Sequence, residues 1–112
     1  MMKVKDIITA LELKVFGGSQ GLDREITGGY TSDLLSDVMG YAENGKIWIT
    51  LQTHKNVIAI ASLKELAAVI LIKGNDPDTD MLAQAKEEGI PVLGTNEEAF
   101  EITGKLFNLL NH

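Results

Sequence analysis

The chain has 112 residues, a length suited to one domain that buries a core without disulfides or structural metals. It contains no cysteine, which excludes disulfides, thiol nucleophiles and cysteine-ligated metals and makes the cytoplasm the expected compartment. A net charge of −6 and an aromatic content of 5% disfavour duplex and single-stranded nucleic acids. No apolar run reaches the ~20 residues that cross a bilayer. We therefore expect neither nucleic acid nor a membrane as a partner.

Apolar and charged residues alternate with helical spacing at the start of the chain, and glycines separate the segments that follow. The elements expected in the first half are an amphipathic helix over 3–11, a strand over 13–16, an extended segment over 24–30, and a helix over 34–39. Asn44-Gly45 is expected to form a tight turn before the next strand.

From residue 47 onward strands and helices alternate. The expected order is a strand over 47–51, a helix over 54–65, a strand over 67–72, a helix from Pro77 to Gly89, a strand over 90–93, and a last helix after Thr95. Continuous apolarity in the 67–72 segment predicts the central strand. We expect Pro77 at the first helical position, Pro91 at or near a sheet edge, and Thr95 and Glu98 in a capping box.

This alternation is typical of right-handed βαβ units. It predicts one α/β domain over residues 1–112, with three layers in which helices cover both faces of a mainly parallel sheet. Ligands bind such sheets outside the carboxyl ends of the strands. Small polar residues are expected at those ends, at 28–33, 52–54, 73–76 and 94–96.

One pattern resembles a phosphate-binding loop but lacks its context. Residues 40–47 have the spacing of that loop, yet Ile47 stands where a Ser or Thr would hold magnesium. The segment also joins a helix end to a strand, whereas such loops lead into a helix whose amides face the phosphate. We therefore do not predict a nucleotide-hydrolysing loop here.

His54 and His112 are the only histidines, and His112 is a terminal residue that we expect to be poorly ordered. His54 with Asp33 or Asp37 could serve as an acid–base pair in a small hydrolase or transferase. Helix capping by His54 and an acidic first helical turn at Asp33 and Asp37 explain the same residues more simply. We predict no catalytic residues, no metal site and no cofactor.

Asp23-Arg24, followed after two residues by Thr27-Gly28-Gly29, matches the motif that names the DRTGG domain family. The order of elements along the whole chain is similar to that family too. The resemblance implies a fold like the amino-terminal domain of HPr kinase/phosphorylase, which lacks the kinase active site. Family members stand beside CBS domains, in some pyrophosphatases and ahead of phosphate acetyltransferase domains. The resemblance thus implies a regulatory or assembly role toward a separate partner enzyme, without catalysis.

We predict a non-catalytic regulatory or ligand-binding module that acts as a homodimer. A nucleotide or another anion would occupy a pocket of small polar residues with Arg24 supplying charge, the full set being Arg24, Thr27, Gly28, Gly29, Thr31, Ser32, Gln52, Thr53 and His54. The last helix is apolar over about half its circumference, which predicts an interface at Phe100, Leu106, Phe107 and Leu110. The alternative is a pure interaction domain without a small-molecule ligand, in which the paired glycines approach a second subunit.

Overall fold

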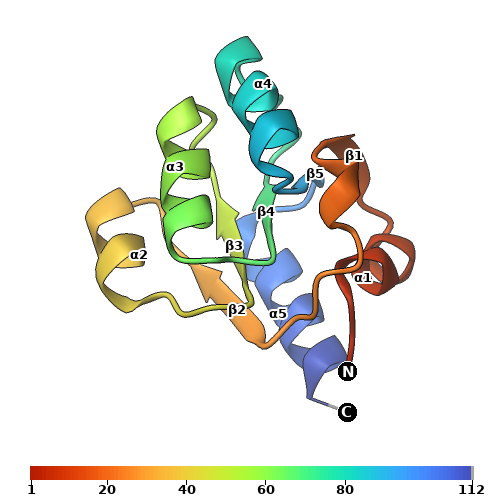
Figure 1. Ribbon diagram of the computed structural model, residues 1–112. Helices are drawn as coiled ribbons and strands as arrows, with labels where there is room; N and C mark the ends of the chain where they lie inside the picture. Colours follow the sequence, from red (N-terminus) through yellow and green to blue (C-terminus); the bar gives the residue numbers. More distant parts are fainter. Residues whose placement is uncertain (112) are drawn as a thin grey trace.

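The computed structural model describes residues 1–111. His112, which the sequence predicts to be poorly ordered, lies outside the described residues. In chain order the elements are α1 (Val4–Leu11), β1 (Lys14–Gly17), the 3₁₀ turn η1 (Ser19–Gly21), β2 (Gly28–Thr31), α2 (Leu35–Tyr41), β3 (Lys46–Thr50), α3 (Lys55–Leu63), β4 (Ala68–Leu71), α4 (Thr79–Glu88), β5 (Val92–Gly94) and α5 (Ala99–Leu110) (Figure 1). Each segment predicted from the sequence is present, with shifted ends.

The strands form one sheet in the order β1-β5-β4-β3-β2. Four of them, β2 to β5, are parallel, and β1 pairs antiparallel with β5. The apolar strand β4 lies at the centre, as predicted, with all four of its residues buried. β2 lies at an edge beside β3, so the series of parallel βαβ units begins at β2, earlier than residue 47.

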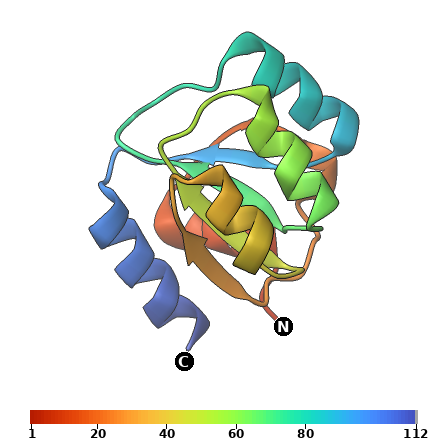
Figure 2. The ribbon, with the colours of Figure 1, turned by 90° about the vertical axis from the view of Figure 1, so that its left-hand side faces the viewer.

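Helices cover both faces of the sheet, which confirms the predicted three layers. On one face α2, α3 and α4 pack over a core that contains Trp48 and Val69. On the other face α1 and α5 pack over Ile47, Ile49 and Ile70. Figure 2 shows α5 across the sheet from α2, α3 and α4. Successive residues of β3 enter opposite cores because side chains alternate along a strand.

The start of α4 lies two residues later than predicted. Pro77 was expected at the first helical position, but the helix begins at Thr79 and Asp78 is its N-cap. The Asp78 amide donates to the Thr53 carbonyl at 2.9 Å, and the Thr53 hydroxyl contacts the Asp78 carboxylate at 3.1 Å. These bonds hold Asp78 in an extended conformation, so Pro77 remains outside the helix.

The last strand and helix differ in part from their predictions. Pro91 was expected at or near a sheet edge; β5 is the strand next to the edge strand β1, and Pro91 precedes β5 with its carbonyl accepting from Val69 at 3.0 Å. Thr95 was expected to cap α5, but Glu98 is the N-cap without a side-chain bond. The Thr95 hydroxyl instead accepts from the Glu97 amide at 3.2 Å, which forms a local turn before the helix.

Within residues 1–111, no helix has the length and apolar character needed to cross a membrane.

Candidate functional site

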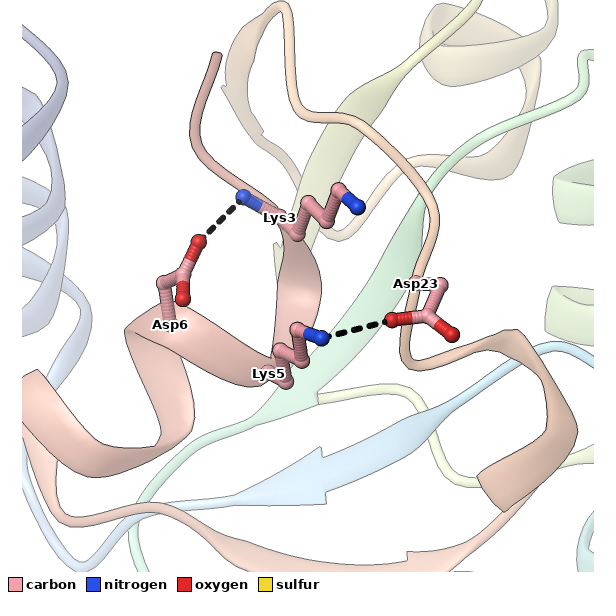
Figure 3. Close-up of polar contacts among 4 residues, drawn as sticks. All are labelled: Lys3, Lys5, Asp6 and Asp23. Atoms are coloured by element: carbon pink, nitrogen blue, oxygen red, sulfur yellow. Dashed lines mark hydrogen bonds and ion pairs between the residues drawn. The ribbon is translucent and has the colours of Figure 1, made fainter.

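The first residue of the motif, Asp23, forms an ion pair with α1. Its carboxylate lies 2.9 Å from the Lys5 ammonium, and at the start of α1 the Asp6 carboxylate accepts from the Lys3 amide at 2.8 Å (Figure 3). The hydrogen bond and charge of Lys5 lower the pKa of Asp23, and Asp23 in turn raises the pKa of Lys5. Both side chains are exposed, so this pair positions the segment without forming a pocket.

Arg24 and Thr27 lie at the amino end of β2, although the predicted ligand pocket joined them to residues at the carboxyl ends of the strands. Both line a hollow of about 590 Å³ with Glu65 and Asn44. The Arg24 carbonyl accepts from the Val4 amide at 3.0 Å, and the Thr27 hydroxyl donates to the Asn44 carbonyl at 2.8 Å. These contacts join the motif to α1 and to the turn before β3.

Gly28 and Gly29 are the first two residues of β2, and each meets a different neighbour. Gly28 has φ 158°, and a Cβ there would lie 2.8 Å from the Lys46 ammonium. Gly29 faces α5, where a Cβ would lie 3.1 Å from a methyl group of Leu106. The absence of side chains therefore lets Lys46 and α5 approach β2.

The motif glycines and the predicted interface helix line the same groove, which lies between β2 and α5. Its volume is about 480 Å³, and its lining includes Thr27, Gly28, Gly29, Thr31, Lys46, Thr103, Leu106, Phe107 and Leu110. At one end the hydroxyls of Thr31 and Thr103 lie 2.8 Å apart. Leu106 is only 1% exposed and belongs to the core, while Phe107 is 65% exposed. Part of the predicted ligand set thus shares a surface with part of the predicted interface.

The other predicted ligand residues lie at the opposite end of β2, beyond the carboxyl ends of β2 and β3. There the Asp33 carboxylate accepts from the Thr50 hydroxyl at 2.9 Å and from the Leu51 amide at 2.7 Å. The Gln52 side-chain amide donates to the Asp33 carbonyl at 2.9 Å, and its oxygen lies 3.1 Å from Nε2 of His54. This network holds two loops together.

Ser32 and Thr53 belong to the same end of the sheet. The Ser32 hydroxyl accepts from the Leu34 amide at 3.2 Å, and the Thr53 hydroxyl contacts Asp78. The set predicted from the sequence is therefore divided between the two ends of one strand and does not line a single pocket.

The acid–base pairs considered for a small enzyme are not assembled. Asp33 bonds to the loop after β3, and Asp37 accepts from the Tyr30 hydroxyl at 2.9 Å, so each carboxylate has its own partner. Burial and the bond to Asp37 raise the pKa of Tyr30. Nδ1 of His54 is buried and has no hydrogen-bond partner in the described chain. Among residues 1–111, no three acidic or histidine side chains gather as a metal site would require.

Sequence reasoning missed Lys46 and Thr103 as residues of the groove. Lys46 was considered only as part of a phosphate loop that its context excluded, and Thr103 lies among the apolar residues of the last helix. For Thr103 a signal was available in the alternation of side chains along a strand. Thr31 lies on the same face of β2 as Gly29, which is the face that α5 covers, so a polar residue of the last helix was to be expected opposite Thr31.

A mainly parallel sheet lies between two helical layers, with a glycine pair on its edge strand and α5 against that pair, so the chain is a three-layer α/β domain. A model of the DRTGG domain matches residues 6–109. The chain belongs to the DRTGG domain family, which confirms the resemblance found in its motif.

The fold is similar to a solved structure of the CBS and DRTGG domains of the regulatory region of Clostridium perfringens pyrophosphatase, complexed with the activator diadenosine tetraphosphate. The TM-score is 0.68 and the sequence identity 14%. The similarity covers 94% of this chain and 45% of that chain, so this chain corresponds to less than half of the regulatory region. No curated protein sequence matches this chain.

Proposed function

We propose that this chain is a non-catalytic regulatory module that binds a nucleotide or another anionic small molecule and acts, as a homodimer, on a separate partner enzyme. The groove beside β2 carries this proposal, because it combines a cation, hydroxyl groups and an apolar wall. The pyrophosphatase regulatory region that contains the similar fold forms a complex with a dinucleotide activator, which supports a regulatory role. That region holds CBS domains as well as the DRTGG domain, so its complex assigns no ligand position to this chain.

Charge supports an anionic ligand at the amino end of β2. Thr27 lines both hollows at this end, with Arg24 in one and Lys46 in the other. Within residues 1–111, neither of these two cations forms an ion pair. Arg24 and Lys46 would therefore neutralise, from opposite sides, a phosphate that lies beside the Thr27 hydroxyl. Phe107 and Leu110 offer apolar surface to a base.

A thermal-shift series tests the ligand. We expect millimolar AMP, ATP or diadenosine tetraphosphate to raise the melting temperature, since a ligand at 100 times its Kd adds about 2.7 kcal/mol. Lys46→Ala and Arg24→Ala should each reduce the shift, whereas Lys64→Ala, the same change at the end of α3, should leave it intact. Inorganic phosphate and pyrophosphate separate recognition of a nucleotide from recognition of any anion. No stabilisation by any of these compounds would refute the ligand-binding proposal.

A second location for the ligand is the polar network at the other end of the sheet. There the Gln52 side chain contacts Nε2 of His54, and the buried Nδ1 of His54 lacks a hydrogen-bond partner within the described residues. If His54→Ala removes the thermal shift and Lys46→Ala does not, the ligand binds at this end.

The alternative function is a pure assembly domain with no small-molecule ligand. Phe100 and Phe107 favour it, because 86% of one and 65% of the other is exposed on one helix. Self-association without any thermal shift would support this alternative over the ligand-binding module.

A further inference from the structure

A hollow lies at the carboxyl ends of β4 and β5, where the chain changes direction. The segment after β4 leads to α4 and the segment after β5 leads to α5, and these two helices cover opposite faces of the sheet (Figure 2). Open α/β sheets bind ligands in the crevice that forms at such a switch point. Within residues 1–111, β4 and β5 are the only parallel neighbours with this arrangement, because α2, α3 and α4 share one face.

The hollow has a volume of about 180 Å³ and is lined by residues 74–76 after β4, by residues 94–96 after β5, and by three residues at the start of β1. Backbone bonds fix the separation of the two segments. The Gly74 amide donates to the Thr95 carbonyl and the Lys73 amide to the Glu97 carbonyl, both at 2.9 Å. A ligand would therefore enter a cavity whose walls are already in place.

Phe16 and Gly94 close the hollow toward the core. A Cβ on Gly94 would lie 2.5 Å from the Phe16 ring, so glycine allows that ring to lie against the end of β5. The Lys14 ammonium stands 4.8 Å from the centroid of the same ring, which also packs on the core beneath α2, α3 and α4. Because Lys14 and the core occupy the ring, this hollow offers a nucleobase no aromatic face for stacking.

Both signs of charge line the hollow. Lys14 supplies one ammonium group, Glu12 and Asp76 supply two carboxylates, and no ion pair within residues 1–111 involves any of the three. A phosphate would meet two negative charges and only one positive charge. A metal ion is disfavoured too, because no three acidic or histidine side chains gather in the described chain. The charges instead match a small molecule that carries both a carboxylate and an ammonium group.

Asp76 is the better of the two carboxylates for pairing with a ligand ammonium group. Glu97 chiefly, and Glu12 to a lesser degree, raise the pKa of Lys105 in α5, so the charge of Glu12 already acts on a cation outside the hollow. Asp76 has no such partner among the ion pairs of residues 1–111.

The neutral side chains of the hollow supply a donor and an acceptor. The Asn75 amide nitrogen donates to the Ile72 carbonyl at 2.9 Å, which leaves the side-chain oxygen of Asn75 as an acceptor. The Thr95 hydroxyl accepts from the Glu97 amide at 3.2 Å and keeps its own proton for another bond. A carboxylate and an ammonium group would each find one neutral partner beside a charged one.

From these features we propose that the hollow binds a free amino acid. Its carboxylate would pair with Lys14 and accept from Thr95, and its ammonium group would pair with Asp76 and donate to Asn75. The size fits, since a cavity of about 150 Å³ holds benzene, whereas drug-sized ligands need about 300–1,000 Å³. The hollow shares no lining residue with the groove beside β2, so this site is separate from the one proposed for a nucleotide.

An NMR titration of the isotope-labelled chain with each of the twenty common L-amino acids at millimolar concentration tests the site. At least one of them should shift the amide resonances of Gly74, Asn75 and Asn96 and leave those of Gly29 and Thr31 in place. If none of the twenty does so, or if the resonances that move lie only beside β2, the proposal is overturned. A nucleotide that shifts only the resonances beside β2 reports the proposed function separately.

Single-charge analogues test whether both charged groups are recognised. The amino acid that gives the largest shift is compared with its decarboxylated amine and its deaminated acid, which for alanine are ethylamine and propionate. Each analogue should bind at least about 10-fold more weakly, as expected for the loss of a charge-assisted hydrogen bond. Analogues that bind the wild-type chain as tightly as the amino acid would refute the proposal.

Two exposed residues of the hollow allow each charge to be removed from the protein side. Lys14→Ala should abolish the preference for the amino acid over its amine, and Asp76→Asn should abolish the preference over its deaminated acid. Lys64→Ala and Asp80→Asn are the matched controls outside the hollow and should keep both preferences. Circular dichroism verifies that the variants fold. Preferences that survive in Lys14→Ala and Asp76→Asn would show that other residues bind the ligand and would overturn the assignment.

Discussion

Replacing Gly28, Gly29 and Gly40 by alanine, one at a time, tests why glycine stands at each of these positions. Gly28 has φ 158°, a conformation that residues with a Cβ rarely adopt, whereas Gly29 is limited only by Leu106. Gly40, in the last turn of α2, has no atom within 4 Å of an added Cβ. The same chemical change therefore meets backbone strain, a close side chain and open space.

The magnitudes follow from these neighbours. At Gly28 the added methyl group meets the flexible end of Lys46, so backbone strain of about 1–3 kcal/mol dominates, less a gain of about 0.4–1 kcal/mol from restricting the unfolded chain. We expect a net loss of about 1–2 kcal/mol. Gly29→Ala requires Leu106 to move slightly, which offsets the same gain and leaves a change within about 0.5 kcal/mol. Gly40→Ala should stabilise the chain by about 0.5–1 kcal/mol, because alanine is the better helix former.

Urea unfolding measures the series. The single tryptophan, Trp48, is fully buried, so its fluorescence reports loss of the core between β3 and the helices. All variants must be compared at one protein concentration, because association shifts the midpoint. If Gly29→Ala costs as much as Gly28→Ala, or if Gly28→Ala is neutral, the distinction between backbone strain at one glycine and side-chain packing at the other is wrong.

Three further outcomes are expected. Trp48→Phe removes a 2.8 Å hydrogen bond from the indole to the loop after β2 and should lower the free energy of unfolding by about 1–3 kcal/mol, measured by circular dichroism in urea. Lys5→Ala should raise the pKa of Asp23 toward its ordinary value, as measured by an NMR titration. Because the pKa of Asp23 is lower in the folded chain than in the unfolded chain, the pair stabilises the fold at pH values above the unfolded pKa. This contribution is lost as the pH falls through the folded pKa. Asp37→Asn should lower the pKa of Tyr30 in an ultraviolet titration but leave it above its ordinary value, since burial is the larger cause of the shift.

The sequence predicted those parts of the fold that depend on periodicity. The buried apolar run at 67–72 became β4, and the helical spacing over 3–11 became α1, because both patterns are set by burial within one element. Element ends set by contacts distant in sequence were predicted less well. Pro77 has the residues of a helix start around it, but the bond from Asp78 to the loop after β3 delays α4, and no local pattern contains that bond.

The candidate site was predicted only in part for the same reason. The motif identified Gly28 and Gly29 correctly as positions of close approach, but the approaching groups, Lys46 and Leu106, come from later elements. Whether a residue lies at the amino or the carboxyl end of a strand depends on where that strand begins. An extended segment expected at 24–30 placed the glycines near the end of the strand, whereas β2 begins at Gly28.

The motif joins three parts of the molecule, and this limits what it can say about the ligand. Asp23 binds α1 through Lys5, the Thr27 hydroxyl holds the turn before β3, and Gly29 admits α5 to the edge strand. Each of these contacts is intramolecular, so they explain the motif without reference to a ligand. Any specificity for a small molecule must therefore come from residues outside these contacts. In the groove beside β2 the side chain best suited to supply it is Lys46, whose charge no ion pair within residues 1–111 neutralises. A DRTGG chain with a neutral residue at this position should keep the fold and lose anion binding there.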